Sequence, residues 1–198
     1  MREYEVMYTD INPVQIRKKL KAIGAKKKYK RIFKWTNFDF PDWRLHKDHS
    51  WIRLRNEGDK VTLTYKQRLG PGKGGNGNDK GMKEISFAID DFDMACHFFK
   101  AIGMTVKYEV EKEREHWVLN DLEFDIDKYP LIQPLLEIES TSMAKVGKGI
   151  KLLGLDPEKK KIQTAYQIYL DNGTDIEKFI TIHFDKQKKR RVNEMPAS

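Results

Sequence analysis

Charged residues two positions apart recur along the chain, each pair within an otherwise apolar or β-prone run. Side chains at i and i+2 of a β-strand point to the same face of a sheet. The pattern therefore predicts a sheet with one apolar face and one face that carries like-charge pairs. The pairs are Glu3 and Glu5, Arg53 and Arg55, Lys66 and Arg68, Lys112 and Arg114, Asp125 and Asp127, and Glu137 and Glu139. Such pairs cost energy unless the opposite charge or a bound ion lies across from them.

The spacing of apolar residues predicts the elements that carry these pairs. Strands are expected at about 2–9, 28–39, 50–57, 60–69, 84–89, 105–119, 122–128 and 133–140. Asn12 and Pro13 predict the start of a helix that ends at Gly24, since Asn is a good N-cap and Pro is favoured at the first helical position. A second helix is expected after Asp91, and two more at about 142–154 and 157–170.

A weak internal repeat relates the two halves of the chain. The first helix ends in Lys21-Ala22-Ile23-Gly24, and the second ends in Lys100-Ala101-Ile102-Gly103. Each helix follows a strand and precedes a long basic strand, and two such halves can close against each other without exposed sheet edges. We therefore predict an α+β fold, an eight-stranded antiparallel β-barrel with a polar lumen and helices packed outside. An open sheet with one face in water is the alternative.

Composition predicts a soluble cytoplasmic protein with an anionic partner. The 198 residues carry 38 basic and 30 acidic side chains, a net charge of +8. Cys96 is the single cysteine, no apolar run reaches the roughly 20 residues that a membrane span needs, and Met1 to Asp10 does not resemble a signal peptide. We expect one folded domain over 1–172 and a basic extension over 173–198 that is partly disordered at its end.

The two signs of charge suit the two parts of a metal–polyphosphate complex. Hard divalent cations such as Mg²⁺ and Mn²⁺ prefer carboxylate oxygens and usually keep water and phosphate ligands. Arginine binds phosphate oxygens in a bidentate way, and lysine binds them as a point charge. Phosphoryl transfer needs positioning and charge neutralisation more than covalent help. The residues therefore predict a site for a polyanion and its metal ions.

The same residues carry a family resemblance. The segments concerned are Glu3 to Glu5, Trp51 to Arg55, Thr64 to Lys66, Lys112 to Arg114, and Phe124 to Asp127 followed by Leu136 to Glu139. As an ordered set they resemble the CYTH superfamily, the triphosphate tunnel metalloenzymes, over about residues 2–170. That superfamily includes class IV adenylate cyclases, thiamine triphosphatases and inorganic triphosphatases. The resemblance implies an eight-stranded antiparallel tunnel that binds a triphosphate with Mg²⁺ or Mn²⁺.

Roles for single residues follow from the resemblance by position. The implied phosphate ligands are Arg53, Arg55, Lys66, Arg68, Lys112 and Arg114. The implied metal ligands are Glu3, Glu5, Asp127, Glu137 and Glu139, with Glu84 and Asp125 as further candidates. Asp127 is preferred over Asp125 because its spacing of ten to Glu137 matches the family pattern.

Two positions depart from the family pattern. The motif Glu-x-Glu-x-Lys ends here in Met7, and a thioether cannot supply the charge of the lysine that lies near the reacting phosphate. Ser86 stands where the family has an acidic partner for Glu84. No catalytic residue is therefore assigned, and binding of a metal–triphosphate is the safer expectation than turnover.

Three functions stay open on the sequence. Hydrolysis of an organic or inorganic triphosphate, such as thiamine triphosphate or tripolyphosphate, is preferred. A class IV adenylate cyclase that makes cyclic AMP from ATP is the alternative, and a non-catalytic triphosphate- or nucleotide-binding protein is the second. We expect no membrane or nucleic-acid partner, and the resemblance allows a homodimer.

Other motifs have simpler explanations. The segment from Gly70 to Gly81 lacks the spacing of a phosphate-binding loop and is expected to be a flexible connection between strands. Cys96 lies among phenylalanines, which favours a structural thiol. His116 is expected to have a surface or packing role, although its spacing of two from Arg114 leaves a position on the charged face open.

Overall fold

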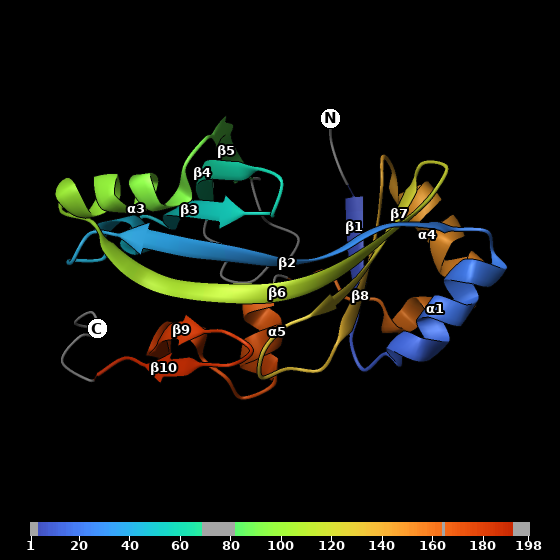
Figure 1. Ribbon diagram of the computed structural model, residues 1–198. Helices are drawn as coiled ribbons and strands as arrows, with labels where there is room; N and C mark the ends of the chain where they lie inside the picture. The colour runs from blue at the N-terminus through green and yellow to red at the C-terminus, as the bar shows by residue number, and fades with distance from the viewer. Residues whose placement is uncertain (1–3, 69–81, 164, 192–198) are drawn as a thin grey trace. The chain divides into compact units, whose positions relative to one another are not determined.

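The computed structural model describes residues 4–68, 82–163 and 165–191, apart from the side chains of Arg68 and Met82 (Figure 1). Glu3 and the expected loop from Gly70 to Gly81 lie outside the described residues. The strands are β1 (Tyr4–Tyr8), β2 (Lys26–Asp39), β3 (Ser50–Asn56), β4 (Val61–Arg68), β5 (Met82–Ile89), β6 (Thr105–Leu119), β7 (Leu122–Lys128), β8 (Leu135–Ser140), β9 (Phe179–Ile182) and β10 (Gln187–Lys189). The helices are α1 (Pro13–Ala22), α2 (Arg44–Lys47), α3 (Phe92–Ala101), α4 (Met143–Leu152) and α5 (Ala165–Asp171).

The eight predicted strands form one sheet in the order β1-β8-β7-β6-β2-β3-β4-β5. The pairs β1–β8, β8–β7, β7–β6, β2–β3, β3–β4 and β4–β5 are antiparallel. The predicted fold class, an antiparallel sheet of eight strands with helices outside, is confirmed. β9 adds to β6 in a parallel direction and pairs with β10. The chain divides into two compact units, residues 1–31 with 113–168 (the first unit) and residues 32–112 with 169–198 (the second unit). Among the described residues, no helix is long and apolar enough to cross a membrane.

The first unit has its core between one face of β1, β7 and β8 and the helices α1 and α4. Val6, Phe124 and Ile138 are fully buried in this core. Asn12 caps α1 as predicted, because its side chain accepts hydrogen bonds from the Val14 and Gln15 N–H groups. Alternation along each strand leaves the opposite face to polar side chains.

Gly149 allows α4 to lie close to the sheet. A Cβ atom at this position would lie 3.1 Å from Ile138 Cγ2 and 3.3 Å from Leu122 Cδ2, whereas one at Gly147 meets nothing within 4 Å. Gly147→Ala is therefore expected to raise the free energy of unfolding by about 0.5–1 kcal/mol through helix propensity. Gly149→Ala gains the same propensity but adds roughly 1–3 kcal/mol of overpacking, so it should be the less stable variant. Urea unfolding of both variants checks this, and equal stability would contradict it.

The second unit has its own core between α3 and one face of β2, β3, β4 and β5. Phe38, Leu54 and Phe99 are buried there, and Phe92, Ala95 and Cys96 pack against them. Cys96 is half-buried, and burial raises the pKa of its thiol to about 11. Those properties suit the predicted structural thiol rather than a nucleophile.

The internal repeat extends to the backbone of the two helix ends. Gly24 and Gly103 follow α1 and α3 with φ of +81° and +89°, the left-handed region that glycine adopts without strain. Each glycine N–H bonds the carbonyl three residues back, Gly24 to Lys21 and Gly103 to Lys100, both at 3.0 Å. The repeated Lys-Ala-Ile-Gly sequence therefore forms the same backbone conformation at the end of both helices.

The described part of the C-terminal extension belongs to the second unit. The stretch from Asp175 to Ile182, which the sequence left open, forms a 3₁₀ turn (Ile176–Lys178) followed by β9. Arg190 lies with its guanidinium carbon 5.3 Å from the Trp43 ring centre, and Lys107 Nζ lies 4.8 Å from the same ring. Trp43 itself adopts φ of 55° before the short helix α2, which the sequence pattern did not predict. Residues 192–198 lie outside the description.

His46 on α2 gives this region a pH dependence. Burial lowers the pKa of His46, and the positive charge of Lys107 lowers it further, while Lys107 Nζ lies 2.8 Å from His46 Nδ1. Because the pKa of His46 is lower in the folded protein, the unfolded chain binds this proton at a higher pH than the folded protein does. The stability contributed by neutral His46 is therefore present above the ordinary pKa of histidine and is lost as pH falls below it. Wild type should therefore lose more stability than His46→Gln between neutral and mildly acidic pH. Thermal unfolding of both proteins tests it, and parallel pH curves would contradict it.

Candidate functional site

Six carboxylates share the polar face of β1, β7 and β8 in the first unit: Glu123, which is exposed and lies opposite Glu139, and five others. We call Glu5, Asp125, Asp127, Glu137 and Glu139 the acidic cluster. Glu5 lies opposite Glu139 in the register of β1 with β8, and Asp125 lies opposite Glu137 in that of β7 with β8. Residues directly opposite each other in an antiparallel pair have their side chains on the same face. The strand pairing therefore brings the predicted acids together.

The cluster runs from buried to exposed. Asp127 is 0% exposed, Asp125 3% and Glu137 7%. Glu139 is half-buried and Glu5 is exposed. Ionised carboxylates in such positions need hydrogen bonds and opposite charge, since burial disfavours the charged form.

Arg114 supplies opposite charge to the buried members. Its Nε lies 2.7 Å from Asp127 Oδ1 and its Nη2 lies 2.6 Å from Asp127 Oδ2, while its Nη1 lies 2.6 Å from Asp125 Oδ2. Nη2 also contacts Glu137. Burial alone would lower the pKa of Arg114, but Glu137, Asp127 and Asp125 hold that pKa well above its ordinary value. One guanidinium therefore contacts three carboxylates of the cluster.

This geometry bears on the role that the resemblance implied for Arg114. A guanidinium has five N–H donors, and the acidic cluster accepts from most of them here. The structure thus places Arg114 with the proposed metal ligands. Its part in phosphate binding stays a prediction.

Met7 lies within the same face. It is opposite Glu137 in the register of β1 with β8, and it is buried, with 5% of its surface exposed. A lysine at this position would therefore project beside Glu137. The thioether leaves Glu137 with Arg114 as a cationic partner, which is the local consequence of the departure found in the sequence.

Two further residues border the cluster and were not assigned from the sequence. His116 Nδ1 lies 2.7 Å from Asp125 Oδ1, and its ring stacks on Tyr29 with centroids 4.9 Å apart. Tyr129 is buried, and burial together with Asp127 and Glu137 raises its pKa well above the ordinary value. For His116 the signal was its spacing of two from Arg114, whereas nothing in the local pattern marked Tyr129.

Two carboxylates of β6 point to the face opposite the acidic cluster, and their contacts indicate a structural role. Glu115 accepts from Arg17 Nε at 3.1 Å and from Trp117 Nε1 at 2.9 Å. Glu113 lies 2.9 Å from Lys30 Nζ and 3.4 Å from Lys128 Nζ. Each of these two carboxylates has its own cations, whereas three members of the acidic cluster share Arg114.

The predicted phosphate ligands of the second unit lie on the polar face of β3 and β4. Arg53 and Arg55 lie opposite Thr64 and Thr62 in the register of β3 with β4. Arg55 pairs with Glu57, which also lies 3.5 Å from Lys60 Nζ. Arg55 therefore has an acidic partner within this unit.

Lys66 and Lys112 have different surroundings. Lys66 Nζ lies 2.9 Å from Glu84 Oε2, so the candidate metal ligand Glu84 is the ion-pair partner of a predicted phosphate ligand. Lys112 is 8% exposed, with its Nζ 5.9 Å from the centre of the Phe33 ring. Arg68 lies on β4, opposite Met82.

Ser86 has a defined partner in place of the missing acid. Its hydroxyl lies 2.9 Å from that of Thr64, and the two residues are opposite each other in the register of β4 with β5. Thr64 is in turn opposite Arg53. Thr64, one member of this neutral hydroxyl pair, therefore lies beside Arg53.

The donor set of the acidic cluster fits a hard divalent cation. Carboxylate oxygens are the ligands that Mg²⁺ and Mn²⁺ prefer. A second group of donors in the second unit, Glu111, His183 and Asp185, has its ligand atoms within 4.8 Å of one another. There Lys34 Nζ already lies 2.8 Å from Glu111, which makes it the weaker candidate.

Comparisons with known proteins show the family and the fold of the chain. The model of the CYTH domain family matches residues 1–180. The solved structure of the PH1012 protein from Pyrococcus horikoshii is 23% identical, with a TM-score of 0.65, and the match covers 84% of this chain and 99% of that one. A search of curated proteins found no match.

Two further solved structures are similar. A proposed adenylate cyclase from Vibrio parahaemolyticus is 14% identical, with a TM-score of 0.67, and the match covers 85% of this chain and 97% of that one. A proposed adenylyl cyclase from Hippeastrum is 15% identical, with a TM-score of 0.62 and coverage of 87% and 97%. At these identities the likeness establishes the fold.

Proposed function

The chain belongs to the CYTH domain family, and from that premise we propose that it binds a triphosphate with a divalent metal ion and hydrolyses it. The observation that carries this proposal is the acidic cluster around Arg114. Carboxylates from three neighbouring strands share one face there, and carboxylate oxygens are the ligands that Mg²⁺ and Mn²⁺ prefer, which supports a divalent cation at this face.

The proposed division of roles follows the two signs of charge. Glu5, Asp127, Glu137 and Glu139, with Glu3, would hold Mg²⁺ or Mn²⁺, and Asp125 would support them. A bound divalent ion polarises phosphoryl oxygens and lowers the pKa of water. The proposed phosphate ligands are Arg53, Arg55, Lys66, Arg68, Lys112 and Arg114. These cations would orient the triphosphate and neutralise charge that develops on its equatorial and bridging oxygens.

The proposed substrate is an organic or inorganic triphosphate, such as thiamine triphosphate or tripolyphosphate. Hydrolysis is preferred over cyclisation partly because the similar Hippeastrum protein, a proposed adenylyl cyclase, has a dominant triphosphatase activity. ATP is a substrate of either reaction, so its products separate the two. Cyclic AMP with pyrophosphate would identify a cyclase, and phosphate release would identify a hydrolase.

The test is phosphate release from tripolyphosphate, thiamine triphosphate and ATP, with Mn²⁺ or Mg²⁺ and with a chelator. Glu137→Gln should abolish the metal-dependent part, and Lys66→Gln should raise KM, because each removes one charge from a proposed contact. Lys145→Gln changes an exposed ion pair with Asp121 and serves as the control. Turnover that is equal with chelator, or absent on every triphosphate, would overturn hydrolysis.

Binding without turnover is the second candidate, and Met7 is the observation that favours it. The residue opposite Glu137 carries no charge, so the lysine that the family places near the reacting phosphate has no counterpart here. Calorimetric titration of tripolyphosphate in the presence of Mn²⁺ distinguishes the two. Tight metal-dependent binding together with no phosphate release would favour this candidate over hydrolysis.

A further inference from the structure

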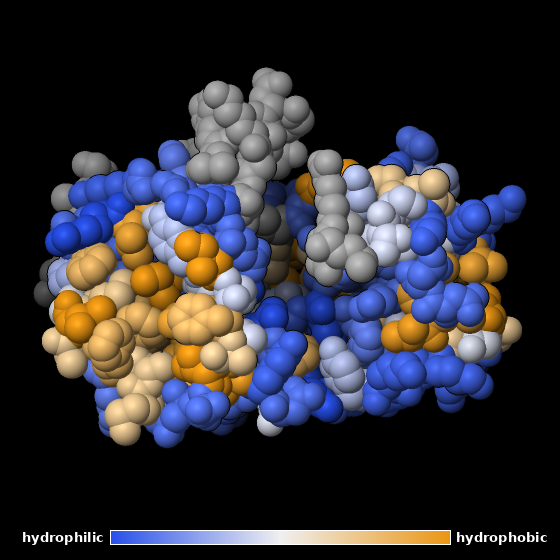
Figure 2. All heavy atoms as spheres, turned by 90° about the horizontal axis from the view of Figure 1, so that it is seen from above, coloured by the Kyte–Doolittle hydropathy of each residue, from blue (hydrophilic) through white to orange (hydrophobic). Residues whose placement is uncertain are grey.

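An exposed apolar surface covers part of the second unit. Five large side chains on β5 and α3 are each between 51% and 63% exposed, and we call them the apolar patch: Ile85, Phe87, Met94, Phe98 and Ile102. Figure 2 shows hydrophobic residues gathered over the part of the molecule that carries α3, β4 and β5. An exposed group of this kind is uncommon on a monomeric protein and marks an interaction site.

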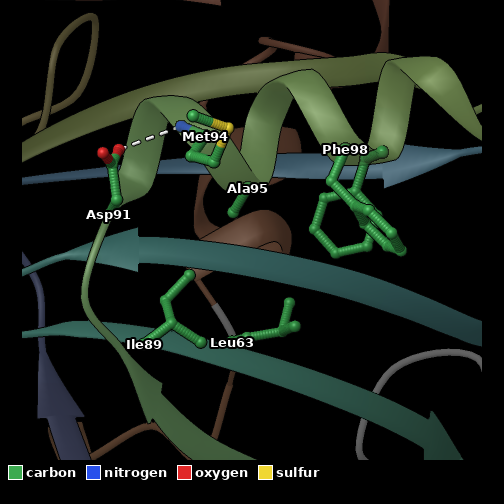
Figure 3. Close-up of a pocket in the computed structure, with 7 residues that line it drawn as sticks. Leu63, Ile89, Asp91, Met94, Ala95 and Phe98 are labelled. Atoms are coloured by element: carbon green, nitrogen blue, oxygen red, sulfur yellow. Dashed lines mark hydrogen bonds between the residues drawn. The ribbon is translucent and has the colours of Figure 1, made fainter.

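The patch is hollowed rather than flat. A pocket of about 430 Å³ lies between α3 and the sheet, lined mainly by Leu63, Ile89, Met94, Phe98 and Phe99. Figure 3 shows Met94 and Phe98 projecting from α3 while Leu63 and Ile89 lie on the strands across from them. A smaller hollow of about 100 Å³ adjoins Ile85 and Phe87 on β5. An apolar protein surface with protruding side chains could fill both.

The size of the patch fits a protein partner. Large side chains of this kind present roughly 150–250 Å² each, so five that are half exposed leave on the order of 500 Å² of apolar area. A stable interface buries about 800 Å² on each partner, with an apolar centre and a polar rim. The patch supplies the centre, and the charged ends of α3 supply the rim.

The charges along α3 identify the partner as a second copy. The N-terminal end carries Asp91 and Asp93, and the C-terminal end carries Lys100, so the helix has opposite signs at its two ends. Two antiparallel copies would bring Asp93 of each beside Lys100 of the other and Met94 beside Phe98. The midpoints of the two pairings lie within half a residue of each other, near the middle of α3. Asp93 and Lys100 lie on one flank because seven residues span two turns.

We propose that two copies of this chain associate through the apolar patch, with their α3 helices antiparallel about a two-fold axis. The interface is isologous, since the same residues contribute from both copies. The antiparallel direction also aligns the helix dipoles favourably, with each N-terminus beside the partner's C-terminus. The inference is independent of the proposed function, because none of these residues is a proposed metal or phosphate ligand.

Sedimentation velocity over a range of micromolar concentrations tests the association. Wild type should dimerise, and Phe98→Glu should be monomeric, because it places a charge at the centre of the interface. Ile162→Glu is the matched control, since Ile162 is an equally exposed apolar residue of the first unit and should leave the dimer intact. Circular dichroism of Phe98→Glu should show an intact fold, because the side chain points to solvent.

A charge exchange tests the antiparallel geometry. Asp93→Lys and Lys100→Asp should each weaken the dimer roughly tenfold, because each brings like charges together across the axis. The double variant Asp93→Lys with Lys100→Asp should recover wild-type association, which misfolding would not do. A monomeric wild type, a dimer that Phe98→Glu leaves unchanged, or a monomer that binds neutral lipid vesicles through the patch would each overturn the proposal. Failure of the double variant to recover would overturn the antiparallel arrangement.

Discussion

Arg114→Met is expected to lower the free energy of unfolding by about 3–5 kcal/mol in metal-free buffer, because it leaves buried carboxylates without their counter-charge. Asp125, Asp127 and Glu137 each contact this guanidinium and are at most 7% exposed. The measurement is urea unfolding of wild type and variant in the presence of a chelator.

Addition of Mn²⁺ should then restore part of the lost stability, and by more in the variant than in wild type. A ligand that binds only the folded state stabilises it by mass action, and the variant offers a more negative site. Arg44→Met is the matched control, since Arg44 pairs with Asp42 at the surface and its loss should change stability far less. Equal losses in the two variants, or no response to Mn²⁺, would contradict a cation site in the acidic cluster.

Met7→Lys is expected to raise metal-dependent phosphate release by on the order of 10²-fold, the contribution typical of one positioned proton-transfer or charge-stabilising group. Residue 7 lies opposite Glu137, so the new ammonium would project beside the proposed metal ligands. A charge there would stabilise negative charge on the reacting phosphoryl group. Initial rates on tripolyphosphate with Mn²⁺ measure the effect.

Met7→Leu separates charge from shape at this position. Leucine keeps the apolar side chain at similar volume, so the rate should stay at the wild-type level. If wild type already turns over rapidly and Met7→Lys does not increase the rate, methionine is no defect, and the binding-only candidate loses its main support. If Met7→Lys binds tripolyphosphate as wild type does and still releases no phosphate, hydrolysis at this site is excluded.

The apolar and charged faces of the sheet could be predicted because alternation is a local property. Asp125 and Asp127 are on the polar face since Phe124 and Ile126 are buried on the other, and the chain order alone shows that. The strand pairing is not local. That Met7 meets Glu137, and that Asp125 meets both Glu137 and His116, depends on the register of strands far apart in the chain.

Arg114 shows what strand register adds to a pattern of charges. It stays a predicted phosphate ligand, and the register of β6 with β7 places it opposite Asp127, which the order of residues along the chain does not reveal. Trp43 and α2 were missed for another reason. A short helix held by tertiary contacts, with Asp39 accepting from the Leu45 and His46 N–H groups, leaves no periodic signal.

The guanidinium within the acidic cluster also bears on the order in which the protein folds and acquires its metal. In small zinc-binding domains the ligands repel one another until the ion arrives, so folding and metal binding are one event. Here Arg114 is part of the chain and accompanies Asp125, Asp127 and Glu137 into the folded state. We therefore expect the protein to fold before any metal is present, and to exchange the proposed ion afterwards without unfolding.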